Sequence, residues 1–381
     1  MRIAQVAPLY ESVPPQLYGG TERVVSYLTE ELVELGHEVT LFASGDSHTR
    51  AKLVPACPQA LWRDPNCRET LPQHVRLMQM VFEDVSRFDL IHFHCDYLQF
   101  PLLRLCPCRS VTTIHGRLYK PDLKELFSAY GEVPLVSISD NQREPLPDAN
   151  WQATVYHGLP RNLHTFRSRS EGYLAFLGRI SPEKRLDRAI EIARRAGRKL
   201  KVAAKIYPED RKYFAERIEP LMQESQDFVE FIGEVGGRDK DEFLGNAAAL
   251  VFPIDWPEPF GLVMIESLAC GTPVVAWRCG SVPEVIDDGV TGFIVDTLDQ
   301  AVQAVNRVAS LSRHACRRTF EERFDAARMA RGYVEVYRRL QHGGSEPAVV
   351  SEPTLPMASQ LSRPRMQRSR MPLLGAVTGI A

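Results

Sequence analysis

Two glutamates eight positions apart, Glu258 and Glu266, enclose the segment PFGLVMI. This segment follows a run typical of a strand and opens a helical pattern, so we expect Phe260 and Gly261 at the helix start. Unpaired N–H groups and the helix dipole there favour an anion or sugar oxygens. Because carboxylates accept hydrogen bonds from pairs of hydroxyl groups, the segment suits a polyhydroxylated ligand. In the alternative interpretation, Glu258 is only an acid that the helix dipole stabilises, and Glu266 is an ordinary surface glutamate.

Two cations, Arg179 and Lys184, follow another strand-like run in the segment GRISPEK. Pro182 suits the first turn of the helix that we predict next, because its missing N–H would be unpaired there in any case. Two permanent positive charges beside a helix N-terminus can bind a diphosphate. Two solvated cations at the start of a helix are the alternative interpretation.

Glycines and histidines stand near other predicted strands. Gly19 and Gly20 open the first predicted helix, where backbone amides can approach a phosphate closely, although a simple tight turn also explains the pair. The dinucleotide fingerprint GxGxxG does not occur in this segment. His115 and His157 are expected to end their strands, and ligands of parallel sheets bind beyond the carboxyl ends of strands.

A pair of histidines, His92 and His94, shares one face of a predicted strand, as two metal ligands could. The matching residue types nearby are Cys95 and Asp96 alone, so we predict that both histidines make structural hydrogen bonds instead. We identify no clear metal–diphosphate motif, and we expect neither a metal ion nor a resident cofactor.

The elements that position these residues come in two similar series. Strands are predicted at 2–7, 38–43, 89–94, 110–115, 135–139 and 153–157, and again at 173–177, 199–204, 228–232, 249–253, 273–276 and 292–295. Helical patterns are clearest at 21–35, 75–87, 183–196, 209–223 and 325–340. Strands separated by helices imply crossover connections, and therefore two doubly wound parallel sheets of the α/β class that face each other across a cleft.

The two series predict two domains. We expect an N-terminal Rossmann-like domain at 1–165, a C-terminal domain at 166–324 and a polar linker at 160–171. The last helix, 325–340, returns to the first domain, and residues 341–381 form a disordered tail. A basic patch in this tail allows at most a weak contact with a membrane surface.

Composition excludes several other classes. The 381 residues hold 46 basic and 48 acidic side chains, so no overall basic excess favours nucleic acid as a partner. No run of about 18 apolar residues predicts a membrane-spanning helix. The N-terminus lacks the pattern of a signal peptide and the eight cysteines are scattered, so we expect free thiols and a cytoplasmic location.

Taken together, these segments resemble family 4 of the retaining glycosyltransferases, which use nucleotide sugars and adopt the GT-B architecture. The resemblance runs from Met1 to about Leu340 and rests on GGTER, GRISPEK, EPFGLVMIE and CGTPVV. It implies catalytic roles for four residues, namely Arg179, Lys184, His115 and Glu258. It implies donor binding by six more, namely Gly19, Gly20, Phe260, Gly261, Leu262 and Glu266. In these roles the cations would neutralise the diphosphate, Glu266 would bind the ribose, and Glu258 and His115 would contact the donor sugar.

Three positions depart from the family pattern. His157 stands where asparagine is usual, Arg185 replaces a glycine after GRISPEK, and residues 204–208 replace a common Gly-x-Gly. The last change affects the loop on the side of the nucleotide base, so we expect a UDP- or GDP-sugar as co-substrate without choosing between them.

The resemblance predicts transfer of a hexosyl group to a carbohydrate or lipid-linked acceptor. A nucleotide-sugar epimerase and a non-catalytic nucleotide-sugar-binding protein are the alternatives, since each would use the same donor site. Acceptor specificity is expected in the first-domain loops 55–71 and 116–122, and the oligomeric state cannot be read from the sequence.

Overall fold

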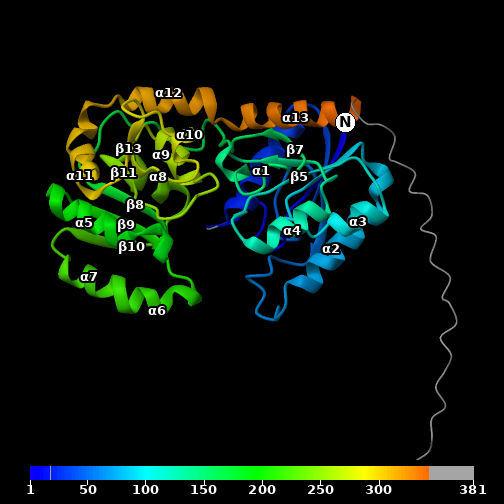
Figure 1. Ribbon diagram of the computed structural model, residues 1–381, viewed down its shortest axis with the longest axis horizontal. Helices are drawn as coiled ribbons and strands as arrows, with labels where there is room; N and C mark the ends of the chain where they lie inside the picture. The colour runs from blue at the N-terminus through cyan, green and yellow to red at the C-terminus, as the bar shows by residue number, and fades with distance from the viewer. Residues whose placement is uncertain (18, 343–381) are drawn as a thin grey trace, which may run out of the picture. The chain divides into compact units, whose positions relative to one another are not determined.

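A computed structural model describes residues 1–17 and 19–342, and two parallel β-sheets organise this part of the chain (Figure 1). The first sheet has the strand order β3-β2-β1-β4-β5-β6-β7. Its strands are β1 Arg2–Val6, β2 Glu38–Ser44, β3 Lys52–Cys57, β4 Leu90–Phe93, β5 Ser110–Thr113, β6 Leu135–Ser137 and β7 Trp151–Thr154. Strand β3 was not predicted, because Pro55 interrupts its pattern; its place at the sheet edge is where a proline is tolerated.

The second sheet has the order β10-β9-β8-β11-β12-β13, and every neighbouring pair is again parallel. Its strands are β8 Leu174–Arg179, β9 Leu200–Lys205, β10 Val229–Gly233, β11 Ala249–Phe252, β12 Val274–Trp277 and β13 Gly292–Val295. The prediction of two doubly wound parallel sheets is therefore confirmed.

Helices cover both faces of each sheet. The helices that lie between the strands of the first sheet in the sequence are α1 Gly20–Glu34, α2 Leu71–Glu83, α3 Phe100–Leu105 and α4 Pro121–Ala129. Those that follow β8 are α5 Leu186–Ala196, α6 Arg211–Tyr213, α7 Glu219–Glu224, α8 Gly237–Gly245, α9 Leu262–Ala269, α10 Val282–Val285, α11 Leu298–Arg307, α12 Arg313–Arg323 and α13 Ala326–His342.

Alternation along the strands divides the first sheet into two cores. Ile3 packs with α1 and α13 on one face, whereas Ala4 packs with α2 on the other. Helix α13 (orange in Figure 1) lies beside α1 and buries Tyr333 and Tyr337 completely. The side chain of Asp325 accepts a hydrogen bond from the Arg328 N–H at 2.8 Å and so caps the start of α13. The predicted return of the last helix to the first sheet is confirmed.

Two predicted helices are interrupted. In place of a helix at 183–196, Pro182–Lys184 forms a 3-10 turn, Arg185 is left-handed with φ 55°, and α5 begins only at Leu186. In place of a helix at 209–223, a π-helical turn at Phe214–Ile218 separates α6 from α7. Pro220 follows this turn and has no N–H to continue an α-helical ladder, so the regular pattern breaks there.

Other predicted limits shift by a few residues. Helix α2 begins at Leu71, not at residue 75, with a proline in its first turn. Helix α13 extends to His342, two residues into the predicted tail, and the rest of that tail lies outside the described residues. Residues 160–171 contain no helix or strand, while the domain limits themselves stay a prediction. None of the described helices is long and apolar enough to cross a membrane.

Candidate active site

One cavity of about 630 Å³ brings together all ten residues for which the family resemblance implies a role. Its volume lies within the range of roughly 300–1,000 Å³ that is usual for small-molecule sites. Both halves of the chain line the cavity. Gly20 and His115 come from the half with the first sheet, and Arg179, Glu258 and Glu266 come from the half with the second sheet. The cavity is therefore assembled from the loops after several strands, as expected for parallel sheets.

Arg179 is the last residue of β8 and is held by two acids. Its Nε donates to the carboxylate of Asp210, and its Nη2 lies 3.4 Å from a carboxylate oxygen of Glu209. The guanidinium carbon also lies 5.1 Å from the centre of the Tyr207 ring. The hydrogen bond to Asp210 raises the pKa of Arg179, so this position is a fixed positive charge.

Lys184 ends the 3-10 turn and forms an ion pair with Glu258. Both side chains are mostly buried, and the ammonium of Lys184 also lies 5.1 Å from the ring centre of Trp256. The ion pair joins the segments GRISPEK and EPFGLVMIE directly. The sequence could not give this contact, because the two residues are 74 positions apart.

Arg185 explains why the family pattern carries a glycine after this lysine. Its left-handed backbone is costly for a residue with a Cβ, and two ion pairs hold the side chain, at 2.8 Å to Asp187 and 2.7 Å to Asp255. Because α5 begins only after Arg185, the prediction that Arg179 and Lys184 flank the first turn of that helix is wrong.

The segment from Glu258 to Glu266 has the predicted form. Gly261 caps α9 with φ 77°, and a Cβ there would approach Met264 to 2.9 Å and Glu258 to 3.3 Å. Only glycine fits this turn without strain. Phe260 is buried beneath the turn, and Leu262 opens α9.

Glu266 is 5% exposed and is paired with a cation that the sequence did not reveal. Its Oε1 accepts a hydrogen bond from Lys240 Nζ at 2.7 Å. Burial acts to raise the pKa of Glu266, but Lys240 and the nearby His164 outweigh it, and the net pKa is lowered. Glu266 is therefore an ionised hydrogen-bond acceptor in a buried wall.

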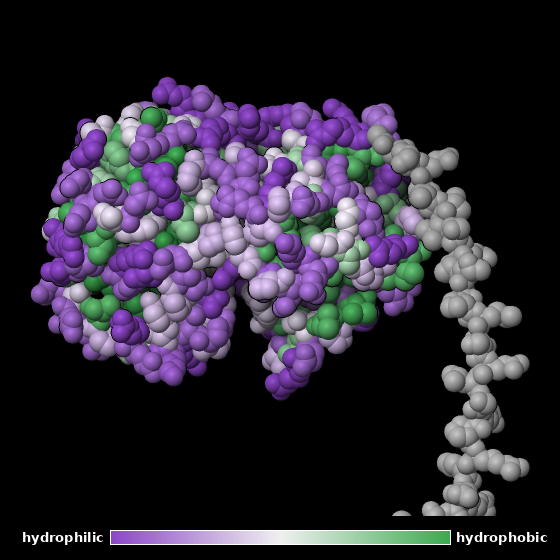
Figure 2. All heavy atoms as spheres, viewed as in Figure 1, coloured by the Kyte–Doolittle hydropathy of each residue, from purple (hydrophilic) through white to green (hydrophobic). Residues whose placement is uncertain are grey.

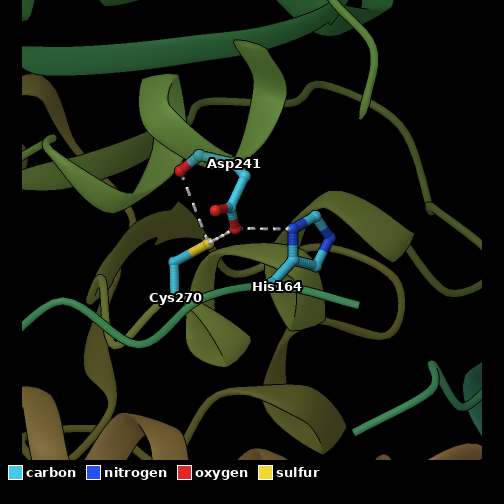
Figure 3. A group of neighbouring side chains, drawn as sticks. All are labelled: His164, Asp241 and Cys270. Carbon is cyan, nitrogen blue, oxygen red and sulfur yellow. Dashed lines mark hydrogen bonds and ion pairs between the residues drawn. The ribbon is translucent and has the colours of Figure 1, made fainter. Parts of the chain in front are cut away.

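Asp241, the residue after Lys240, belongs to a cluster beside this wall (Figure 3). Its Oδ1 accepts from His164 Nδ1 at 3.3 Å and from the Thr165 N–H at 2.7 Å, and Cys270 Sγ lies 3.8 Å away. Burial raises the pKa of Cys270, so its thiol is protonated in this arrangement and can donate to Asp241. We interpret the cluster as hydrogen bonding that fixes α8 against the end of α9.

The glycine pair forms the turn into α1. Gly19 has φ 145°, and a Cβ there would lie 2.8 Å from Pro15. Gly20 is the first residue of α1. If it carried a Cβ, that atom would lie 3.7 Å from Cδ1 of Leu262. The start of α1, in the half with the first sheet, therefore lies close to the start of α9, in the half with the second sheet. Both glycines line the cavity.

His115 lies two residues beyond β5 and His157 three beyond β7, so neither ends its strand as predicted. Their rings stack with centroids 5.2 Å apart. The Nε2 of His115 is 2.8 Å from Nδ1 of His94, while its buried Nδ1 has no hydrogen-bond partner among the described residues. Burial lowers the pKa of His115 to about 3, so the ring is neutral.

A buried chain of hydrogen bonds extends from His94 to the last helix. His94 Nε2 lies 2.8 Å from Gln5 Oε1, and Gln5 donates to the hydroxyl of Tyr337 at 3.2 Å. The same hydroxyl lies 2.7 Å from His92 Nδ1, and His92 Nε2 lies 2.7 Å from the Thr113 hydroxyl. The predicted structural hydrogen bonding of both histidines is confirmed, and His94 additionally lines the cavity.

Comparison with known proteins finds a matching family model for each half of the chain. The model "Glycosyltransferase Family 4" matches residues 18–139, and "Glycosyl transferases group 1" matches residues 165–324. The chain is 32% identical to a D-inositol 3-phosphate glycosyltransferase of Mycolicibacterium smegmatis, over 74% of this chain and 76% of that protein. The chain belongs to glycosyltransferase family 4. As a family 4 enzyme, it catalyses glycosyl transfer.

Solved glycosyltransferases share the GT-B architecture of this family 4 enzyme. AviGT4, a glycosyltransferase involved in avilamycin A biosynthesis, is 27% identical with a TM-score of 0.68, over 90% of this chain and 98% of that one. The Anabaena protein HepE, solved with UDP and glucose, is 15% identical with a TM-score of 0.69, over 89% and 99% of the two chains.

Proposed function

We propose that this glycosyltransferase moves a hexosyl group from a nucleotide diphosphate sugar to a carbohydrate or lipid-linked acceptor, with retention of the anomeric configuration. The proposal rests on one observation, the presence of Arg179 and Lys184 in the same cavity as Glu258 and Glu266. Two fixed cations suit a diphosphate, and two carboxylates suit the hydroxyl groups of a ribose and a sugar. The donor, a UDP- or GDP-sugar, is a substrate, and we propose no resident cofactor.

The two cations act on the leaving group. Cleavage of the bond between the anomeric carbon and the phosphate oxygen leaves negative charge on the nucleotide diphosphate. Arg179 and Lys184, together with the Gly20 amide, stabilise that charge more strongly in the transition state than in the bound donor. Because Asp210 already orients Arg179, little reorganisation is needed when the charge develops.

The carboxylates act on the two ends of the donor. Glu266, kept ionised by Lys240, accepts hydrogen bonds from the ribose hydroxyls. Glu258 lies against Lys184 and so places the sugar next to the diphosphate. His115 has a buried Nδ1 available for a sugar hydroxyl. HepE holds UDP and glucose, which supports the capacity of this fold to bind a nucleotide and a sugar together.

Thermal unfolding in the presence of UDP, GDP, UDP-glucose and GDP-mannose tests the donor site. A ligand that binds the folded state at 100 times its Kd adds about 2.7 kcal/mol of stability. We expect stabilisation of the wild type and of Lys201→Ala, a control on β9 outside the cavity, and a much smaller shift in Lys184→Ala. An equal shift in both variants, or none in the wild type, would contradict the proposal.

The same proposal predicts the effect on turnover. Removing a preorganised group that stabilises transition-state charge costs about 10²–10³ in rate, so we expect such losses in Arg179→Ala and Lys184→Ala. Circular dichroism should show that both variants stay folded. Near-normal transfer rates in both would exclude the diphosphate role.

A further inference from the structure

Large apolar side chains are exposed on the wall of the cavity that the first sheet supplies. Trp62 is 55% exposed, Leu71 57% and Tyr97 40%, and all three line the cavity. Two of them belong to the loop 55–71, where we expected acceptor specificity. In Figure 2, hydrophobic residues also gather over the end of α2 that joins this loop. Side chains of this size are usually buried, and an exposed group of them marks a binding surface.

Ring contacts and hydrogen bonds hold the residues of this surface together. The rings of Tyr10 and Trp62 lie 5.1 Å apart, and those of Tyr10 and His74 lie 4.8 Å apart. The backbone N–H of Trp62 donates to the Tyr10 carbonyl at 3.1 Å, and the backbone N–H of Leu9 donates to His74 Nε2 at 3.1 Å. An aromatic group held in this way can stack on a ligand at little conformational cost.

The charges of this wall are acidic. Asp96 and Glu22 both line the cavity; Asp96 is exposed, whereas burial raises the pKa of Glu22 to about 7, so Glu22 is partly protonated at neutral pH. The one arginine or lysine that lines the cavity from described residues of the first sheet and its helices is Arg23, and it donates to the Leu17 carbonyl. A phosphate group on an acceptor would therefore lie beside these carboxyl groups, and the cations nearest to it on this wall would be Arg23 and, close to Asp96, Lys120.

Asp96 is the polar group best placed to meet an acceptor. Its backbone is left-handed with φ 51°, a conformation that is uncommon for a residue with a side chain. Its side chain lies close to Gly116, the residue after His115: a Cβ added to Gly116 would be 3.8 Å from Asp96 Oδ1. No described residue donates a hydrogen bond to the Asp96 carboxylate, which is therefore available to a hydroxyl group of the acceptor.

We infer that the acceptor is an uncharged sugar or glycoside, whose apolar face packs on Trp62 and whose hydroxyl donates to Asp96. This inference rests on the proposed function. In the transfer, the acceptor oxygen bonds to the anomeric carbon as that carbon's bond to the phosphate oxygen breaks. The proton of the reacting hydroxyl leaves with the nucleotide diphosphate, and the hydroxyl that donates to Asp96 is a different one on the same acceptor. The wall disfavours phosphorylated acceptors because a phosphate group there would face the carboxylate of Asp96.

Matched acceptors test the charge selection. Nucleotide release is measured with UDP-glucose and with GDP-mannose as donors. The acceptors are phenyl and methyl glycosides of glucose, galactose and mannose, the corresponding 6-phosphates, and myo-inositol with inositol 1-phosphate. We expect at least about tenfold higher kcat/KM for a neutral glycoside than for its phosphate, and higher values for phenyl than for methyl glycosides. Preference for a phosphate, or no transfer to any neutral acceptor while the donor still binds, overturns the inference.

Variants at the wall separate this inference from the donor site. In Trp62→Ala we expect the acceptor KM to rise about tenfold while the thermal shift caused by the donor is unchanged, and Trp62→Phe should restore most of the affinity. Leu105→Ala is the matched control, because Leu105 is 82% exposed and lies outside the cavity. Equal acceptor KM values in Trp62→Ala and Leu105→Ala overturn the inference. Loss of the donor shift in the wild type would instead contradict the proposed function.

Discussion

Single residues in the cavity wall derive their properties from partners that are distant in the sequence. Glu266 is a buried carboxylate that would be costly without compensation, and Lys240 of α8 supplies the compensating charge at 2.7 Å. Because the two side chains are fixed on adjacent helices, the carboxylate is oriented as well as ionised. Lys240 is thus a positioning residue for the proposed ribose site.

Replacing Lys240 should weaken donor binding in a manner that depends on pH. In Lys240→Ala, the buried Glu266 loses its main partner, its pKa rises, and it is protonated at a higher pH than in the wild type. We expect donor Kd to increase about tenfold at neutral pH and further as the pH falls. Titration calorimetry between pH 5.5 and 8 measures this effect, with Lys240→Arg as the rescue variant and Lys201→Ala as the control. The same Kd in Lys240→Ala and the control at every pH would disprove the role.

At the scale of elements, a chain of hydrogen bonds links helix α13, the last described helix, to the cavity. Tyr337 contributes one hydroxyl to Gln5 and His92, and Gln5 in turn contacts His94, the neighbour of His115. These groups are buried, so the loss of one hydrogen bond leaves others unpaired. The helix therefore both covers the first sheet and orients polar groups in the cavity.

Tyr337→Phe should separate these two effects of α13. Leaving buried hydrogen-bonding groups unpaired costs about 1–3 kcal/mol, so we expect a lower Tm. We also expect kcat to fall with an unchanged donor KM, because Gln5 and His94 lose their fixed orientation. Tyr333→Phe is the comparison, since its hydroxyl accepts from Thr113 at 3.1 Å and does not contact Gln5. If both variants lose stability and kcat equally, α13 has a purely structural role.

Local patterns predicted most elements, and distant contacts account for what was missed. Residues 292–295 are strand β13 as predicted, and the turn at Gly261 follows from glycine before an apolar helical pattern. The left-handed Arg185 could not be predicted, because Asp255, one of the two acids that hold its side chain, is 70 positions away. Lys240 was missed for the same reason, since its partner lies on another helix. The exposure of Trp62 likewise depends on the packing of its loop against the first strand's loop.

At the scale of the whole molecule, buried histidines link stability to pH. Burial holds the pKa values of His92, His94, His115 and His157 below the usual 6.5. Below pH 6.5 the unfolded chain therefore binds protons that the folded chain does not, and stability falls as the pH falls, by up to about 1.4 kcal/mol per pH unit for each histidine. Glu22, with a raised pKa of about 7, acts in the opposite direction, as do other carboxyl groups with raised pKa values such as Glu31.

Urea unfolding at pH 7.5 and pH 5.5 tests this balance. We expect a smaller free energy of unfolding at pH 5.5. The variant His157→Asn, which introduces the residue usual in the family, should reduce the difference between the two pH values, because one buried histidine is removed. Equal or greater stability at pH 5.5 in the wild type would mean that the histidines take up protons in the folded state.

The packing of α13 on the first sheet also has a consequence for biosynthesis. Residues 326–342 supply side chains such as Met329, Tyr333 and Tyr337 to a core whose buried members outside α13 all come from the first half of the chain. A ribosome makes that half first, and the second sheet must be translated before these side chains emerge. The nascent first half therefore carries an incomplete apolar face through the synthesis of more than 150 further residues, a period in which such faces favour aggregation and chaperone binding.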